Sequence, residues 1–118
     1  MIWEILISEE YESWFKKLPQ KHKVAIASDL EVLRDIGPTL GRPYVDQIKG
    51  SKFNNLKELR TKVPGHVYRS LFAFDPERKA IMLSGGDKKG KSQEQFYRQL
   101  IAQAEIVFEN HIKLLQNK

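Results

Sequence analysis

The stretch NLKELRTKVPGHVYRSLFAFDPERKAIMLS, residues 55–84, decides the fold of this chain of 118 residues. It contains three strand candidates in close succession, over 55–62, 67–75 and 79–84. Proline, glycine and charged residues separate the runs, and connections of three or four residues are too short for a parallel crossover. The stretch therefore predicts a meander of three antiparallel strands.

The residues before the meander predict one strand and two helices. Residues 2–7 form a short β-rich run, and Ser8 can cap a helix that Pro19 stops. A second helix is expected to begin near Gln20 and to end at a Gly-Pro pair, because its apolar residues recur at helical spacing. Residues 39–53 contain glycine and proline and are interpreted as a connecting loop.

The residues after the meander predict one long helix. Ser92, with Gln95 three positions later, has the capping-box pattern, and apolar residues from Phe96 onward follow the helical period. The predicted architecture is a single α+β domain over residues 1–118 with the order β-α-α-β-β-β-α. An N-terminal helical hairpin and a C-terminal helix accompany an antiparallel meander sheet in this prediction.

The charge balance favours a polyanionic partner. Twenty Lys and Arg residues against fifteen Asp and Glu give a net charge of +5 and a pI near 9.5, which indicates nucleic acid more than an anionic small molecule. The chain has no cysteine, and its three histidines lack zinc-ligand spacing, so we expect no disulfide, metal ion or other cofactor. We expect neither a signal segment nor a membrane span, and a reducing cytoplasm is the expected compartment.

The segment GGDKKGKS, residues 85–92, matches the pattern of a nucleotide-binding phosphate loop. A nucleotide loop also needs a parallel sheet whose later strands supply a magnesium-binding acid, whereas a single helix is predicted to follow here. We therefore expect no nucleoside triphosphate. The lysines Lys88, Lys89 and Lys91, together with the free N–H groups of the helix start, are expected to meet the phosphates of an RNA backbone.

Charged residues interrupt the core faces of the predicted meander. Period-two alternation places Glu58 and Arg60 on one face of the first strand and Arg69 among apolar residues on one face of the second. Burying a guanidinium is costly unless it is paired. Each of Arg60 and Arg69 therefore either meets a carboxylate such as Glu58 or opens onto a groove that holds an anionic ligand. Tyr97, near the start of the terminal helix, is expected on the same side if that helix packs over the sheet.

These segments resemble the RelE/ParE toxin superfamily, and most of all its HigB-like, phage-associated branch. The resemblance covers nearly the whole length, and its most specific elements are NLKELR at 55–60, the G-x-x-YR element at 65–69, FAFDPERKAIML at 72–83, and the lysine-rich loop before Phe96 and Tyr97. It implies the toxin of a toxin–antitoxin module that cleaves messenger RNA, usually on the ribosome, without a metal ion. The nucleophile would be the 2′-OH of the substrate, and a helix-turn-helix antitoxin would be the cognate partner.

The resemblance also implies roles for individual residues. Arg69 corresponds to an arginine that contacts the scissile phosphate, and Arg60 supplies a second cation. Lys88, together with Lys89, takes the place of a basic residue that stabilises the transition state or the leaving oxygen. Tyr97 occupies the aromatic position that stacks on a base or assists proton transfer.

The identity of the general base stays open, because Glu58 has two possible roles. Glu58 stands where some ribosome-dependent relatives have a lysine, so it is either the base or a carboxylate that holds an arginine in place. Lys57, Lys89 and Lys91 are expected to bind RNA. His66 is expected to be a solvated histidine of the hairpin turn.

Two other functions fit the same sequence. A ParE-like protein would bind and poison DNA gyrase without cleaving a nucleic acid, and a noncatalytic module would bind RNA through its charge. The combination of Arg60, Arg69, Lys88 and Tyr97 favours cleavage, because a gyrase-binding protein would not require it.

Overall fold

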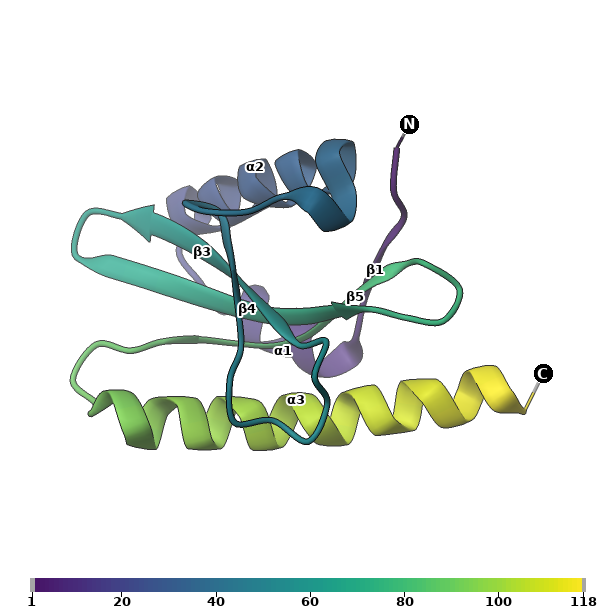
Figure 1. The fold of residues 1–118 in the computed structure, drawn as a ribbon. Helices are drawn as coiled ribbons and strands as arrows, with labels where there is room; N and C mark the ends of the chain where they lie inside the picture. Colours follow the sequence, from purple (N-terminus) through teal and green to yellow (C-terminus); the bar gives the residue numbers. More distant parts are fainter. Residues whose placement is uncertain (1, 118) are drawn as a thin grey trace.

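A five-stranded sheet with helices on both faces forms the fold of residues 2–117, the part of the chain that the computed structural model describes (Figure 1). In chain order the elements are β1 (Ile5–Ile7), α1 (Glu9–Phe15), α2 (Gln20–Ile36), the 3-10 turn η1 (Gly37–Thr39), β2 (Val45–Gln47), β3 (Lys57–Val63), β4 (His66–Phe74), β5 (Ala80–Asp87) and α3 (Gln93–Gln116). The predicted α+β class is confirmed, and one short strand is added to the predicted order.

The strands lie in the order β1-β5-β4-β3-β2. The three central strands are antiparallel, as the stretch 55–84 predicted. At one edge β1 runs parallel to β5, with Ile5 opposite Ala80, so the complete sheet is mixed. Parallel pairing needs a long connection, and the helical hairpin and three strands that separate β1 from β5 along the chain supply it.

β2 lies inside the segment that the sequence predicted as a loop. Val45–Gln47 pairs antiparallel with β3, where Val45 stands opposite Leu59 and is only 5% exposed. A strand of three residues shows too little alternation to be recognised from sequence, and pairing with the edge of β3 determines it. The loop prediction for residues 39–53 is therefore wrong at β2.

The two glycines that open the phosphate-loop pattern serve packing. β5 extends to Asp87, so Gly85 and Gly86 lie in a strand and not in the loop. A Cβ atom at Gly85 would lie 2.3 Å from the Trp14 ring, and one at Gly86 would lie 3.0 Å from the Phe96 ring. The glycines thus allow α1 and α3 to approach β5 closely. The loop itself begins at Lys88.

Each face of the sheet carries its own apolar cluster. α3 packs on the cluster that contains Leu71 and Leu83, whereas α1 and α2 pack on the cluster that contains Phe72 and Met82. α3 is 24 residues long and begins at the predicted cap, where the Ser92 hydroxyl accepts the Gln95 N–H. Among residues 2–117, no helix has the length and apolar character needed to cross a bilayer.

Candidate functional site

The register of the central hairpin places two arginines side by side. Arg60 on β3 is the direct partner of Arg69 on β4, and Glu58 lies two residues before Arg60 on the same face. This is the face that α3 covers, because Leu71 of the same β4 face belongs to the cluster under α3. The first turns of α3 bring Tyr97 over these charged side chains.

Glu58 is the centre of the charged cluster. The Tyr97 hydroxyl donates to Glu58 Oε1 over 2.7 Å, and the Nε atom of Arg69 lies 3.5 Å from the same oxygen. Arg60 Nε lies 4.0 Å from Glu58 Oε2. The side chains of Glu58 and Arg69 are 7% and 10% exposed. The contact between Glu58 and Arg69, one of the two alternatives left open by the sequence, is therefore present.

Several N–H groups of the cluster remain without a hydrogen-bond acceptor. Among the described residues, the buried Nε atoms of Arg60 and Arg69 have no partner within hydrogen-bond geometry. The Nη1 atom of Arg69 donates to the Val67 carbonyl over 3.3 Å. Buried donors are nearly always satisfied in folded proteins, and a guanidinium pairs well with phosphate oxygens. The cluster therefore has the donors of an anion site in addition to its internal carboxylate.

Tyr97 is a hydrogen-bond donor at neutral pH. Burial, the hydrogen bond to the Glu58 carboxylate and the charge of that carboxylate together raise its pKa to about 12, against an opposing effect of Arg69. The Arg69 guanidinium lies 5.7 Å from the centre of the Tyr97 ring. The tyrosine thus holds both Glu58 and Arg69 in place, and its hydroxyl stays protonated far above neutral pH.

Two hollows open on either side of the contact between Glu58 and Arg69. The first, of about 370 Å³, is called the lysine hollow here; it is lined by Gly65, His66, Val67, Arg69, Asp87, Lys88, Lys89, Gly90 and Lys91. Lys88 is half-buried, whereas Lys89 and Lys91 are exposed. Among the described residues, none of these three lysines pairs with a carboxylate. The lysine hollow therefore gathers positive charge beside Arg69.

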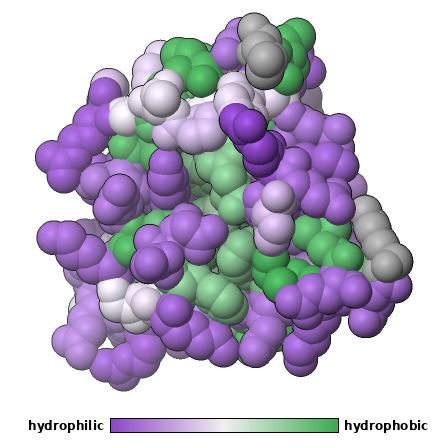
Figure 2. Space-filling view, turned by 45° about the vertical axis from the view of Figure 1, so that its right-hand side comes forward, coloured by the Kyte–Doolittle hydropathy of each residue, from purple (hydrophilic) through white to green (hydrophobic). Residues whose placement is uncertain are grey.

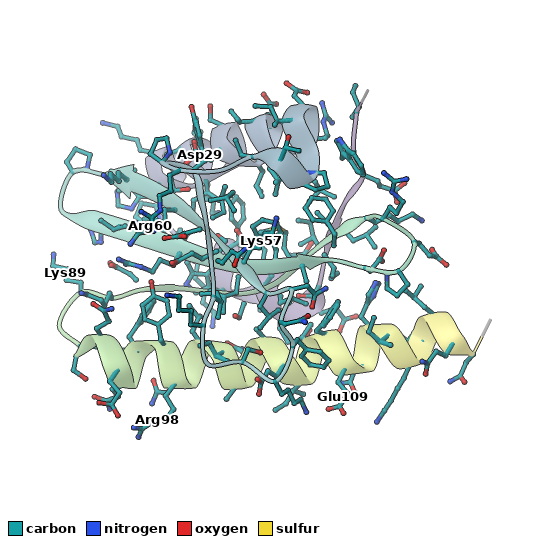
Figure 3. The ribbon with its side chains drawn as sticks, viewed as in Figure 1. Asp29, Lys57, Arg60, Lys89, Arg98 and Glu109 are labelled. Carbon is teal, nitrogen blue, oxygen red and sulfur yellow. The ribbon has the colours of Figure 1, made fainter. Side chains whose placement is uncertain are left out.

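The second hollow, of about 730 Å³, is called the wide hollow here. It lies between β2 with its neighbouring residues, β3, and the start of α3, and it is lined by Arg42, Asp46, Gln47, Ile48, Lys49, Gly50, Glu58, Arg60, Gln93, Glu94, Tyr97, Arg98 and Ile101. In Figure 3, Arg60 extends from the sheet and Arg98 from α3, while Lys89 lies in the loop that joins β5 to α3. The wide hollow gives solvent access to Glu58 and Tyr97.

Lys57 is the one predicted site residue that the structure does not bring to the cluster. It alternates with Glu58 along β3, so its side chain lies on the opposite face of the sheet. Its ammonium group donates to the Pro38 carbonyl over 3.1 Å and lies 5.8 Å from the centre of the Phe74 ring. The sequence named Lys57 for its charge, and strand alternation separates it from the other candidates.

His66 is also placed differently from the expectation of a solvated turn residue. Its Nδ1 atom lies 2.5 Å from Asp87 Oδ2, and its ring is parallel to the ring of Tyr68. Asp87 also accepts the backbone N–H of Lys89, so the pair anchors the lysine loop to β4. No group of three His, Asp or Glu side chains that could hold a metal ion occurs among residues 2–117.

The walls of the wide hollow were missed by sequence reasoning. No sequence motif contains Arg42, Gln47 or Arg98, because they come from a loop, a three-residue strand and an exposed helix turn. Only the pairing of β2 with β3 brings the first two beside Glu58. The only indication in the sequence was a set of basic and amide-bearing residues between 42 and 49. They can be related to Glu58 only once the pairing of β2 with β3 is known.

The backbone belongs to a known class of fold. An Escherichia coli toxin RelE mutant in the free state superposes with a TM-score of 0.60 at 14% identity, covering 86% of this chain and 96% of that one. RelE from the archaeal RelE–RelB complex of Pyrococcus horikoshii superposes with a TM-score of 0.55 at 16% identity, covering 76% of this chain and 99% of that one. The fold is RelE-like.

Sequence comparison gives the family. Residues 13–109 match the family described as phage derived protein Gp49-like. HigB3 of Mycobacterium tuberculosis, provisionally described as a toxin, is 44% identical over 86 residues, which cover 73% of this chain and 74% of HigB3. HigB2 of the same organism, described in the same way, is 40% identical over 105 residues, which cover 88% of this chain and about half, 52%, of HigB2. The chain belongs to the Gp49-like family and is HigB-like.

Proposed function

We propose that this protein is the toxin of a toxin–antitoxin module and acts as a metal-independent endoribonuclease on messenger RNA. One observation carries the proposal: Arg69, nine-tenths buried, keeps an unpartnered N–H beside Glu58 and Tyr97, between two open hollows. Family membership agrees with a toxin, and the basic character of the chain agrees with an RNA partner. Association with the ribosome and action in the cytoplasm are parts of the same proposal.

The reaction divides among the residues of the cluster. Glu58 accepts the proton of the ribose 2′-OH, the 2′ oxygen attacks the adjacent phosphorus, and the bond from phosphorus to the 5′ oxygen breaks. The Lys88 ammonium gives a proton to the departing 5′ oxygen. The products are a 2′,3′-cyclic phosphate and a free 5′-OH end. Atoms and charge balance without a metal ion or cofactor, because the nucleophile belongs to the substrate.

Arg69 and Arg60 stabilise the charge that develops on the phosphorane. Donors that are already in place lower the barrier most, because they need little reorganisation as the charge appears. Tyr97 positions Glu58 through a 2.7 Å hydrogen bond and Arg69 through the face of its ring. Its pKa of about 12 assigns it the role of a donor and not that of the base.

The phosphate must compete with Glu58 for Arg69. In the free protein the carboxylate lies 3.5 Å from Arg69 Nε and occupies one side of the guanidinium. A substrate phosphate that enters between the two hollows can take the unpartnered Nε–H, which frees the carboxylate to act on the 2′-OH. If the phosphate did not replace Glu58 at Arg69, the same cluster would be that of a noncatalytic RNA-binding module.

The proposed antitoxin is a helix-turn-helix protein that covers either the helical hairpin or the cationic cluster. A structural relative was solved as a RelE–RelB complex. Beside β1 and α2 a hollow is lined by four apolar and three charged residues, which are Ile2, Ile5, Ile7, Leu30, Glu4, Glu31 and Arg34. Figure 2, in which the side with the chain ends is turned forward, shows apolar residues exposed between polar ones. Coexpression with the neighbouring reading frame should restore growth and give a copurifying complex.

Growth arrest with mapped RNA ends tests the proposal. Induction of the wild type without its antitoxin should arrest growth and create new 5′ ends inside translated messages. Arg69→Ala should reduce cleavage by about 100-fold or more, because it removes the buried phosphate ligand. Lys113→Ala, which removes a positive charge near the far end of α3, is the control that should keep full activity. A fully toxic Arg69→Ala variant would show that the site is wrong.

A supercoiling assay distinguishes the nuclease from a ParE-like protein that poisons DNA gyrase. A ParE-like protein would inhibit DNA gyrase in vitro while leaving messenger RNA intact. Growth arrest with gyrase inhibition and no new RNA ends would replace the nuclease proposal. Salt-sensitive RNA binding with no cleavage product would leave the noncatalytic module.

A further inference from the structure

The two hollows differ in chemistry, and this difference gives the substrate a direction. We infer that the RNA crosses the site with the nucleotide on the 5′ side of the cut in the wide hollow and the nucleotides on the 3′ side along the lysine hollow. We infer further that the wide hollow selects the base on the 5′ side through the amides of Gln47 and Gln93. The inference rests on the proposed function and adds the strand polarity and the position of base selection.

The position of Glu58 sets the polarity. The attacking 2′-OH belongs to the ribose on the 5′ side of the scissile phosphate, and the base must lie within hydrogen-bond reach of it. Glu58 lines the wide hollow and is absent from the lining of the lysine hollow. The ribose on the 5′ side therefore enters from the wide hollow.

Lys88 gives the same direction from the other side. The departing 5′ oxygen belongs to the nucleotide on the 3′ side of the cut, and the half-buried residue Lys88 lines the lysine hollow, where its ammonium group can protonate that oxygen. Arg69 lines the lysine hollow, while its Nε faces Glu58. The scissile phosphate thus lies at Arg69, between the two hollows.

The wide hollow has the chemistry of a base pocket. Its volume of about 730 Å³ is in the range of small-molecule sites. The exposed side chains of Gln47 and Gln93 line it, and neither side-chain amide has a hydrogen-bond partner among the described residues. Ile48 and Ile101 supply apolar wall. Amide groups carry one donor face and one acceptor face, which suits them to reading the edge of an unstacked base.

Two ion pairs complete the wall of the wide hollow. Arg42 and Asp46 are 3.0 Å apart, and Arg98 and Glu94 are 2.7 Å apart. Each pair joins residues four positions apart, one pair beside β2 and the other on α3. The plane of an arginine guanidinium offers a surface on which a base can stack.

The lysine hollow lacks side chains that could recognise a particular base. Lys88, Lys89 and Lys91 are flexible point charges that attract any phosphate equally. His66 and Asp87 are engaged with each other at 2.5 Å. The 3′ side of the substrate is therefore held by charge without regard to its bases.

Cleavage of an RNA library with random bases on both sides of the cut tests the inference with purified protein. The wild type should show a base preference at the 5′ position that falls by about tenfold in the Gln47→Ala, Gln93→Ala double variant, because bidentate amide contacts discriminate by about that factor. The Lys89→Ala, Lys91→Ala double variant should cut all sequences more slowly, with an unchanged preference and a weaker dependence on salt. Gln116→Ala, at the opposite end of α3, is the matched glutamine control.

Photocrosslinking gives the polarity without any need for cleavage. A 2′-deoxy substitution at the cut removes the nucleophile, so an RNA with 4-thiouridine on either side of the cut can be held on the wild type. Crosslinks from the 5′ side should map to residues 42–50 or the start of α3, and those from the 3′ side to residues 88–91. The reverse pattern, or cleavage with a preference unchanged in the glutamine variant, would overturn the inference while leaving the nuclease intact. RNA that is neither bound nor cut when ribosomes are also present would instead remove the proposed function.

Discussion

Arg60 and Arg69 are direct partners across β3 and β4, with both side chains on the face that α3 covers. Like charges that stand opposite each other in an antiparallel pair destabilise a sheet. The only acid within ion-pair distance of both among the described residues is Glu58. A hairpin that keeps two guanidinium groups for one carboxylate has one positive charge more than its own stability needs. That excess is the physical basis for an anion site in this position.

Glu58→Gln should separate binding from cleavage. The amide keeps an acceptor for Tyr97 but removes the charge that competes for Arg69 and the base that takes the 2′ proton. We expect tighter binding of a 2′-deoxy RNA in anisotropy titrations and single-turnover cleavage slower by about 100-fold or more. Glu12→Gln, on the exposed surface of α1, is the control. Unchanged cleavage would mean that Glu58 only positions the arginines.

Tyr97→Phe should remove a donor and retain the ring beneath Arg69. Loss of the hydrogen bond to Glu58 should lower the free energy of unfolding by about 1 kcal/mol, and cleavage should slow by about tenfold. In an alkaline titration the variant should lack one tyrosinate signal that the wild type shows, and the pKa of that signal should be about 12. The folded pKa exceeds the usual value near 10, so the unfolded chain loses this proton first and stability falls between pH 10 and 12. If the signal that the variant lacks has a pKa near 10 instead, the buried and hydrogen-bonded position of Tyr97 is contradicted.

Asp75 and His111 should make the protein sensitive to acid. The Asp75 carboxyl is fully buried; Oδ2 lies 2.8 Å from His111 Nε2, and Oδ1 accepts the N–H groups of Glu77 and Lys79. Burial alone would raise the pKa of Asp75, but the hydrogen bonds from His111, Lys79 and Glu77 and the charge of His111 outweigh it and hold the pKa below 3.8. The stabilisation is therefore complete above about pH 4 and is lost as the pH falls through the lowered pKa.

Asp75→Asn tests this acid dependence. The variant should lose about 2 kcal/mol in urea unfolding at pH 7, because an amide replaces a buried charge-assisted acceptor. Its stability should then change less than that of the wild type between pH 5 and pH 3. Asp29→Asn on the surface of α2 should behave like the wild type in both measurements. Equal acid sensitivity of Asp75→Asn and the wild type would assign the effect to another carboxyl group.

Gly85→Ala should destabilise the protein through packing. The added methyl group would lie 2.3 Å from the Trp14 ring, so the ring or the strand must move, at a cost of about 2 kcal/mol. Gly41→Ala is the matched control, because nothing lies within 4 Å of its Cβ position. Thermal unfolding of the two variants gives the comparison. Equal stability would mean that the glycine has a role other than making room for α1.

The local pattern of the sequence was sufficient for most of the fold. The turns of the stretch 55–84 are too short for anything but antiparallel pairing, and the meander follows from that limit. Ser92 and the helical period after it likewise predicted the start of α3. The presence of Glu58, Arg60 and Arg69 on core-facing strand positions followed from alternation alone, because a strand has a fixed period of two.

Tertiary pairing decided what these residues do together. β2 is too short to have its own pattern, and without it Gln47 and Arg42 have no relation to Glu58. The sequence placed Lys57 with the RNA-binding residues by charge, whereas its side chain lies on the other face of the sheet. The sequence left the contact of Glu58 with Arg69 as one of two alternatives, and it showed nothing of the separation of the two hollows. Both depend on the crossing of α3 over β3 and β4, which distant side chains determine through packing.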